Sequence, residues 1–112
     1  MNDCIFCKII AGDIPSKKVY EDELCFAFYD INPLAPMHFL VVPKKHLASA
    51  AEITEDDALL VGHICAVIAK LAAELGFADG YRVVTNVGAL AGQTVHHLHF
   101  HVLAGRELGA FN

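Results

Sequence analysis

Histidine alternates with apolar residues near the end of this chain, in the run His97-Leu98-His99-Phe100-His101-Val102-Leu103. Alternation with a period of two is typical of a half-buried strand, so three imidazoles are expected on one face while the apolar side chains pack into the core. Side chains two positions apart on a strand lie about 6–7 Å from each other, close enough for one phosphate-sized group to touch more than one ring. The run therefore predicts a row of near-neutral bases and nucleophiles on a rigid scaffold.

Three roles fit such a row of imidazoles. The histidines could be ordinary residues of an exposed strand face, although strict alternation behind Gly92-Gln93-Thr94 makes this the weakest interpretation. They could hold a catalytic zinc ion, because His-x-His on a strand plus a third histidine leaves one metal position open. In the third role, a neutral imidazole attacks an electrophile while its neighbours orient it and bind the developing charge.

The composition indicates one domain, residues 1–112, with room for a single core. An apolar fraction of 55% is generous for 112 residues, which favours a second subunit covering part of the surface. The formal net charge of −5 argues against a protein that holds nucleic acid by bulk electrostatics. A small phosphate ligand in one local site remains compatible with this charge.

Targeting signals are not expected in this sequence. The N-terminal residues lack a basic stretch followed by an apolar block, so they do not read as a secretory signal. The longest apolar stretch, 58–69, contains His63 and falls short of the roughly 20 residues of a membrane span. We therefore expect a cytoplasmic protein without a membrane segment, in which cysteines are thiols or metal ligands rather than a disulfide framework.

The rest of the chain reads as short strands around one long helix. Strands are expected over 19–20, 24–29, 38–42 and 81–86, with the histidine run as the fifth. Thr54 and Asp57 have the side chains of a capping box, which predicts a helix of about twenty residues that ends at Gly76. One helical turn is expected at 8–10, before Gly12. This order predicts an antiparallel α+β domain.

The long helix has apolar residues on two sides. One side follows helical spacing and should face the core: Leu60, Ile64, Val67, Ile68, Leu71 and Leu75. A second side carries Val61, Cys65 and Ala72, which a soluble monomer would not need. We therefore expect this second side to form a subunit interface.

Cys4 and Cys7 form a Cys-x-x-Cys pair at the start of the chain. A redox role would call for a preceding strand, which is not expected here. The pair could be two free thiols, or half of a structural zinc site, which needs four ligands. The spacing alone leaves these two possibilities open.

Five blocks of the sequence resemble a known family. The run from His97 to Leu103 is similar to the signature of the histidine triad (HIT) family, His-φ-His-φ-His-φ-φ with φ apolar. Four more blocks resemble its Hint branch in the same order and at similar spacing: residues 4–10, 28–31, 36–46 and 80–84. The resemblance implies homodimers with an antiparallel five-stranded sheet, one long helix and one short helix in each subunit.

The resemblance also implies an activity and a set of site residues. Family members bind a nucleoside monophosphate moiety and cleave the bond from its α-phosphate to a leaving group through a covalent nucleotidyl-histidine. The middle histidine, here His99, would be the nucleophile; His101, His97, His38 and Thr94 would complete the catalytic set. The nucleotide would lie against Phe6, Ile10, Phe28, Asp30, Ile31, Asn86, Gly92, Gln93 and Val95, with Asp30 on the ribose hydroxyls.

Two features modify this picture. Branches that keep the cysteine pair resemble the uridylyltransferases of galactose metabolism, in which it joins two histidines around zinc; the matching residues are Cys4, Cys7, His46 and His97. Thr94 stands where Hint members usually have serine, so the hydroxyl is kept but the preference for a leaving group is expected to differ.

The combined expectation is a cytoplasmic, dimeric hydrolase of the Hint type that acts on adenosine 5′-phosphoramidates or related esters and anhydrides of AMP. Structural zinc is expected, and no cofactor is required for catalysis. One alternative is a dinucleoside polyphosphate hydrolase that uses the same His99. The other is a zinc-stapled nucleotide-binding or interaction module with incidental turnover.

Overall fold

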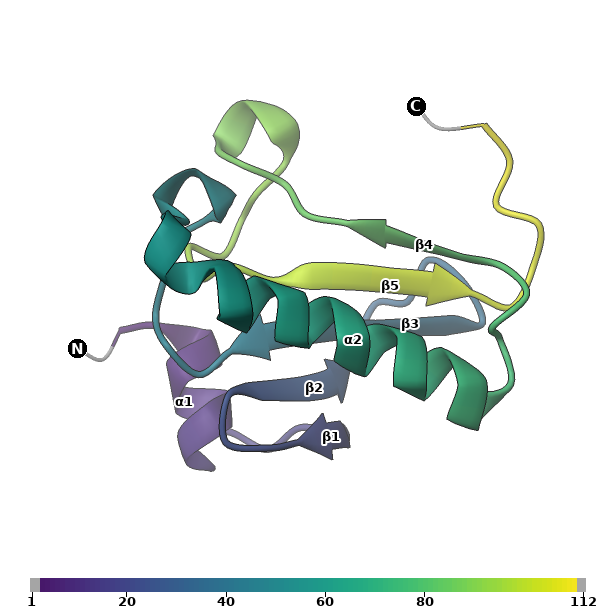
Figure 1. Ribbon diagram of the computed structural model, residues 1–112, viewed down its shortest axis with the longest axis horizontal. Coiled ribbons are helices and arrows are strands. Elements are labelled where there is room, and N and C mark those ends of the chain that lie inside the picture. Colours follow the sequence, from purple (N-terminus) through teal and green to yellow (C-terminus); the bar gives the residue numbers. More distant parts are fainter. Residues whose placement is uncertain (1–2, 111–112) are drawn as a thin grey trace.

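The computed structural model describes residues 3–110 and contains one antiparallel sheet with helices on both faces (Figure 1). The strand order is β1-β2-β3-β5-β4. The strands are β1 Lys18–Glu21, β2 Cys25–Tyr29, β3 Met37–Pro43, β4 Tyr81–Val84 and β5 Phe100–Ala104. The helices are α1 Ile5–Ala11 and α2 Ala58–Leu75, with 3₁₀ turns at Ala50–Glu52, Glu55–Asp57 and Ala89–Ala91. The predicted α+β architecture, with five strands, one long helix and one short helix, is confirmed.

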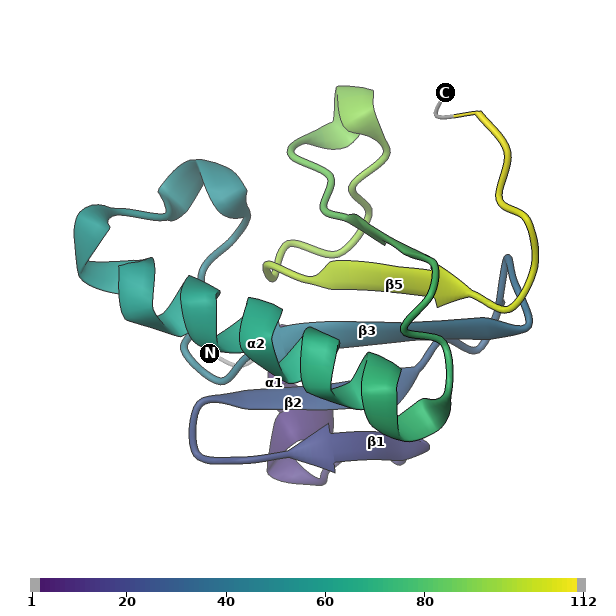
Figure 2. The ribbon, with the colours of Figure 1, turned by 45° about the vertical axis from the view of Figure 1, so that its right-hand side comes forward.

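Alternation in β2 divides the core into two layers. Cys25 and Ala27 face α2, which runs across one side of the sheet in both views (Figures 1 and 2). Phe26 and Phe28 point to the opposite side, where they pack against Phe6 of α1. Both faces of the central strands are therefore covered, which explains why β2 and β3 are buried along almost their whole length.

Helix α1 is longer than the single turn expected at 8–10. Its N-cap is Cys4, whose Sγ accepts a hydrogen bond from the Cys7 N–H at 3.3 Å. It ends at Gly12, which has a φ of 87°, a conformation that glycine adopts without strain. The helix thus begins within the Cys-x-x-Cys pair and carries the intervening Phe6 into the second core layer.

The predicted capping box begins the 3₁₀ turn Glu55–Asp57 that leads into α2, and α2 ends where its sequence signal predicts. The Asp57 carboxylate accepts from the Thr54 backbone N–H at 3.0 Å, and Gly76 ends the helix with a φ of 87°. The assignment of Ala72 to the outer side is wrong, because this residue is fully buried beside Leu71 in the core. Leu75, assigned to the core, is 41% exposed because it lies at the last position of the helix.

The outer side of α2 is nevertheless apolar and open. Leu59 is 89% exposed, and Cys65 lies exposed further along the same helix. By length and composition alone, the segment Glu55–Leu75 could cross a membrane, a criterion that core helices of globular proteins also meet. Here the inner side of the segment packs on the sheet through Ile64, Val67, Ile68 and Leu71.

The predicted histidine strand is shorter than its alternation indicates. Regular strand structure begins at Phe100, so His97 and His99 precede β5. The Leu98 N–H donates to the Leu47 carbonyl at 2.6 Å, a contact outside the sheet ladder. The alternation nevertheless persists into this segment, because Leu98 packs in the α2-side core while His97 and His99 both contact the Phe6 ring on the opposite face.

Gly105, directly after β5, allows a close approach between two segments. Its φ is +99°, and a Cβ at this position would lie 2.9 Å from Pro36 Cβ and 3.3 Å from the Met37 nitrogen. We expect Gly105→Ala to lower the free energy of unfolding by about 2–4 kcal/mol, because backbone strain and steric overlap add. Urea unfolding measures this effect.

Gly109 supplies the matched control for that substitution. Its φ is +74°, but a Cβ there would meet nothing within 4 Å. Gly109→Ala should therefore cost only the backbone strain, about 1 kcal/mol. Equal losses of stability in the two variants would contradict the close packing of Gly105 on Pro36.

Candidate active site

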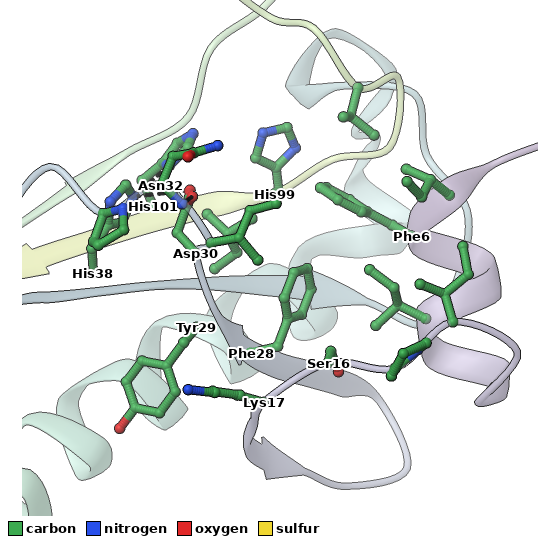
Figure 3. A pocket seen from close by; sticks show the side chains of 18 of the residues that line it. Phe6, Ser16, Lys17, Phe28, Tyr29, Asp30, Asn32, His38, His99 and His101 are labelled. Carbon is green, nitrogen blue, oxygen red and sulfur yellow. Dashed lines mark hydrogen bonds and ion pairs between the residues drawn. The ribbon is translucent and has the colours of Figure 1, made fainter.

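A cavity of about 1100 Å³ opens on the α1 side of the sheet (Figure 3). Its walls come from α1, the connection to β1, the end of β2 with the following loop, β3, the Thr94–Val95 segment and β5. His38, His101 and Asp30 lie together at one end, whereas Phe6 and Phe28 line the part beyond His99 (Figure 3). The cavity therefore joins a polar end to an apolar slot.

His99 is held in one orientation and one tautomer. Its Nδ1 lies 2.7 Å from the His97 carbonyl, and a carbonyl can only accept, so Nδ1 carries the proton. The Phe6 ring packs edge-on against the imidazole at 5.1 Å between centroids. Nε2 is then the unprotonated nitrogen, and within residues 3–110 it has no hydrogen-bond partner. A rigid imidazole on the wall of the cavity thus retains a free lone pair.

His38 and His101 form a second chain of directed hydrogen bonds. The Leu34 N–H donates to His38 Nδ1 at 3.0 Å, so the proton of His38 is on Nε2. His38 Nε2 lies 3.0 Å from His101 Nδ1, which must accept this proton. His101 therefore carries its own proton on Nε2. The two rings that line the cavity next to each other have complementary roles: His99 offers a lone pair and His101 offers an N–H.

Burial keeps this network neutral. It lowers the pKa of His101 to about 4, and the nearby His99 and His38 rings add to this effect. Burial likewise lowers the pKa of His38, against a smaller opposing effect of Asp30, whose Oδ2 lies 3.5 Å from His38 Nε2. Both rings are therefore neutral near pH 7, as the tautomer chain requires.

These lowered pKa values predict that the fold loses stability in acid. In the unfolded chain a histidine takes up its proton near pH 6.5, whereas folded His101 does so near pH 4. Between these values the unfolded state binds more protons, so the free energy of unfolding rises with pH. This contribution is complete above about pH 6.5 and is lost as the pH falls toward about 4.

Urea unfolding at several pH values between 7.5 and about 4.5 tests that dependence. His101→Asn removes one of the groups and should flatten the slope. His96→Asn, at an exposed position, is the control and should keep the wild-type slope. An unchanged slope in His101→Asn would rule out His101 as a source of the acid sensitivity.

Asp30 starts a turn and also lines the cavity. Its Oδ1 accepts from the Asn32 N–H at 2.8 Å, the local bond expected for an aspartate that starts a turn. The residue also lines the cavity, between the apolar slot and the histidines (Figure 3). The turn contact therefore fixes the carboxylate between the apolar slot and the histidines.

Gln93 holds the loop before the histidines rather than the cavity wall. Its Oε1 accepts from the Gly88 N–H at 2.8 Å, and Nε2 donates to the carbonyls of Ala48 at 2.7 Å and Val95 at 3.0 Å. Three of the four hydrogen-bonding positions of this buried amide are therefore occupied by backbone groups, and only one lone pair of Oε1 remains. Thr94 follows at the cavity wall.

The structure brings most, but not all, of the predicted site residues to the cavity. Those on its walls are Phe6, Phe28, Asp30, Ile31, His38, Thr94, Val95, His99 and His101. Those not on its walls are Ile10, Asn86, Gly92, Gln93 and His97. Sequence reasoning missed several wall residues, namely Ile5, Ile9, Ile14, Ser16, Lys17, Asn32 and Leu40. The helical spacing from Phe6 could have indicated Ile9, but no sequence signal marks Ser16 or Lys17.

The side chain of His97 belongs to a separate cluster with Cys4, Cys7 and His46. His97 Nε2 donates to the Pro43 carbonyl at 2.8 Å, which leaves Nδ1 unprotonated. This Nδ1 lies 3.3 Å from Cys4 Sγ, 3.6 Å from Cys7 Sγ and 3.1 Å from His46 Nδ1. His46 Nδ1 is in turn 3.4 Å from Cys7 Sγ.

These distances match the edges of a metal-centred tetrahedron. Zinc at about 2.3 Å from sulfur and about 2.0–2.1 Å from nitrogen gives edges of about 3.5 Å for S···N and about 3.3 Å for N···N. All four ligand atoms lie within 4.8 Å of one another. The cluster is therefore close enough to bind a metal ion, and its two thiols and two imidazoles suit zinc.

Asp22, Cys25 and His63 also lie close together, but Asp22 is saturated. Its Oδ1 accepts from the N–H groups of Leu24 and Cys25 at 2.8 and 2.9 Å. Its Oδ2 contacts Tyr20 OH at 2.8 Å and His63 Nε2 at 2.6 Å. This group therefore ties the β1–β2 turn to α2.

Known proteins are similar to this chain in sequence. A family model described as "HIT domain" matches residues 11–108. An uncharacterized HIT-like protein of Synechocystis sp. is 51% identical over 104 residues, which span 93% of this chain and 91% of that protein.

Solved structures are similar over nearly the whole chain. A histidine triad protein from Clostridium difficile has 52% identity and a TM-score of 0.96, with 100% of this chain and 98% of that chain covered. A HIT family hydrolase from Clostridium thermocellum has 47% identity and a TM-score of 0.95, with 99% and 97% covered. The chain is thus similar to HIT family hydrolases in both sequence and structure.

Proposed function

Because this chain belongs to the HIT domain family, we propose that it is a nucleotide-binding hydrolase. Its substrate is a purine nucleoside monophosphate whose α-phosphate carries a leaving group through a phosphoramidate, ester or anhydride bond. Within this substrate class, we expect adenosine 5′-phosphoramidate to be a good substrate. The observation that carries this proposal is the pairing of the free His99 Nε2 with the His101 N–H on one cavity wall.

The cavity fits the three parts of a nucleotide in order. The apolar slot of Phe6, Ile9, Phe28 and Leu40 suits a base, which is planar and apolar on its faces. Asp30 follows, where its carboxylate accepts hydrogen bonds from the ribose hydroxyls. The phosphate then lies beside His99, His101 and Thr94.

The reaction is a double displacement at phosphorus. The lone pair of His99 Nε2 forms a bond to the α-phosphorus, and the bond to the leaving group breaks with its electron pair. The leaving group takes up one proton from solvent as it departs, as ammonia from a phosphoramidate, and the proton lost by water in the second step replaces it. Water then attacks the cationic phosphoimidazole, loses a proton, and releases AMP and free His99.

The residues around His99 stabilise this sequence. The His97 carbonyl accepts a hydrogen bond from His99 Nδ1–H, and this contact stabilises the positive charge of the intermediate. The His101 N–H donates to a non-bridging oxygen, where charge develops in the transition state. The Thr94 hydroxyl, on the same wall, lies beside the leaving atom.

Zinc in the Cys4, Cys7, His46 and His97 cluster is the structural part of this proposal. Its support is the tetrahedral spacing of the four ligand atoms. When bound, the metal joins the N-terminus of α1 to the segment before β5. The catalytic steps proposed above use side chains, the His97 carbonyl and water.

A cytoplasmic homodimer is the proposed assembly, without nucleic acid or membrane partners. The support is the open apolar side of α2, which includes Leu59 and Cys65, together with the half-exposed Tyr81 and Val83 on edge strand β4. Burial of these apolar surfaces in a second copy would protect them from water. Sedimentation analysis should find a species of twice the monomer mass.

A substrate panel tests this function against its alternatives. We expect release of AMP from adenosine 5′-phosphoramidate, with a chelator weakening substrate binding but not abolishing turnover. Faster turnover of a diadenosine polyphosphate would favour the dinucleotide hydrolase instead. Activity lost immediately to a chelator, in protein that remains folded, would identify a zinc hydrolase. Tight AMP binding with no turnover of any substrate would favour a binding module.

A further inference from the structure

Arg106, beyond the end of β5, contacts a loop 72 residues earlier in the chain. Its Nη2 donates to the Leu34 carbonyl at 3.0 Å, and Nη1 donates to the Glu107 carbonyl at 2.8 Å. The first of these contacts reaches the residue whose N–H determines the tautomer of His38. We propose that Arg106 is a positioning residue that holds Leu34 in place and thereby keeps the His101 N–H directed at the substrate phosphate.

Within residues 3–110, Arg106 is the only hydrogen-bond partner of the Leu34 carbonyl. The Leu34 side chain is 69% exposed, so packing does not anchor it. Pro33 and Pro36 limit the backbone angles of the loop, but they do not fix the distance between the Leu34 N–H and the His38 ring. The close approach of Gly105 to Pro36 brings the next residue, Arg106, within reach of the loop. The Arg106 guanidinium then fixes the Leu34 peptide by a charge-assisted hydrogen bond.

Loss of this anchor would change the direction of the hydrogen-bond chain. Without the Leu34 N–H, His38 Nδ1 is free to carry the proton. Asp30 Oδ2, 3.5 Å from His38 Nε2, still favours the Nε2–H form, so the two tautomers mix, and in the Nδ1–H form His38 Nε2 becomes an acceptor. His101 Nδ1, 3.0 Å away, must in that case donate to it. The result is a bare His101 Nε2, which cannot donate to a phosphate oxygen.

This inference rests on the proposed function for its catalytic consequence, but the tautomer effect does not require a substrate. Nitrogen chemical shifts of ¹⁵N-labelled histidine distinguish protonated from bare ring nitrogens. Because His101 is neutral well above pH 4, spectra near pH 7.5 report its tautomer. Single His→Asn variants assign the signals of His38 and His101.

Arg82 provides a matched control. It is also an arginine that donates to backbone carbonyls, those of Leu108 and Gly109 at 3.5 and 2.7 Å, but it makes no contact with Leu34. Arg106→Lys provides the conservative test, since an ammonium group keeps a donor for one carbonyl. Urea unfolding of each variant checks that the fold is retained.

We expect Nε2–H tautomers for His38 and His101 in the wild type and in Arg82→Ala, and mixed tautomers in Arg106→Ala. The kcat of Arg106→Ala should fall about tenfold with little change in KM, and Arg106→Lys should recover most of it. Unchanged tautomers in a folded Arg106→Ala variant would overturn the proposal. Changed tautomers in a protein without phosphoramidase activity would support the positioning role and contradict the proposed function alone.

Discussion

Replacing His99 with alanine is expected to lower kcat/KM for adenosine 5′-phosphoramidate by about 10⁴-fold or more. The substitution removes the lone pair of Nε2, and loss of a nucleophile costs this much when the remaining groups only bind and orient the substrate. AMP affinity should change little, because the base slot and Asp30 remain. Steady-state kinetics and equilibrium AMP binding measure the two effects separately.

The control for this substitution is His96→Ala, at an exposed histidine in the same segment. It should retain wild-type kinetics. A His99→Ala variant with more than about a tenth of the wild-type kcat would show that water attacks phosphorus directly. In that case His99 would be no more than an orienting group.

Removal of metal is expected to cause the largest loss of stability. Structural zinc contributes about 10–16 kcal/mol in small zinc-finger domains, and this domain has a core of its own, so we expect a loss of at least about 3 kcal/mol. Cys7→Ser should lose a similar amount, because it removes one of four ligands. Urea unfolding with and without a chelator measures both changes.

Sensitivity to the chelator is the sharper readout of that experiment. The wild type should lose stability when the chelator is added, whereas Cys7→Ser should show little further change. Cys65→Ser replaces a thiol on the outer side of α2 and should keep the sensitivity of the wild type. A wild type that contains no metal and is indifferent to the chelator would contradict the zinc proposal.

Metal removal should also weaken nucleotide binding, because the two sites share residues. The His97 side chain belongs to the metal cluster, while its carbonyl holds His99 Nδ1. Phe6 lies between the two cysteines in sequence and packs on His99 and on Phe28 in the base slot. Movement of α1 would therefore reach both the nucleophile and the base slot.

The sequence predicted the fold well where a pattern has one physical cause. The strand predicted over 24–29 is present as β2, and its continuous apolar run has a single cause, because both faces of the strand are covered by apolar layers. The Thr54 and Asp57 pair predicted the start of α2, because capping is a local interaction. The long-range arrangement of Cys4, Cys7, His46 and His97 came from family resemblance, since no local pattern joins residues so far apart.

Local pattern does not show which site a side chain joins. The alternation correctly placed Leu98 in the core and His97 and His99 on the face of Phe6, but only the three-dimensional structure brings His97 Nδ1 next to Cys4 Sγ. Gln93 was predicted to lie against the nucleotide; the structure shows its amide bonded to three backbone groups, those of Gly88, Ala48 and Val95. Such bonds depend on the distance between chain segments, which a single sequence does not encode locally.

The most direct test of covalent catalysis is intact mass spectrometry of protein quenched during turnover of adenosine 5′-phosphoramidate. The wild type should gain the mass of one adenylyl group, and His99→Ala should gain none. Peptide mapping should place the adduct on His99, the residue with the free Nε2 at the cavity wall. Turnover without an adduct on either protein, abolished by a chelator, would contradict the nucleotidyl-histidine mechanism and assign the chemistry to a metal-activated water.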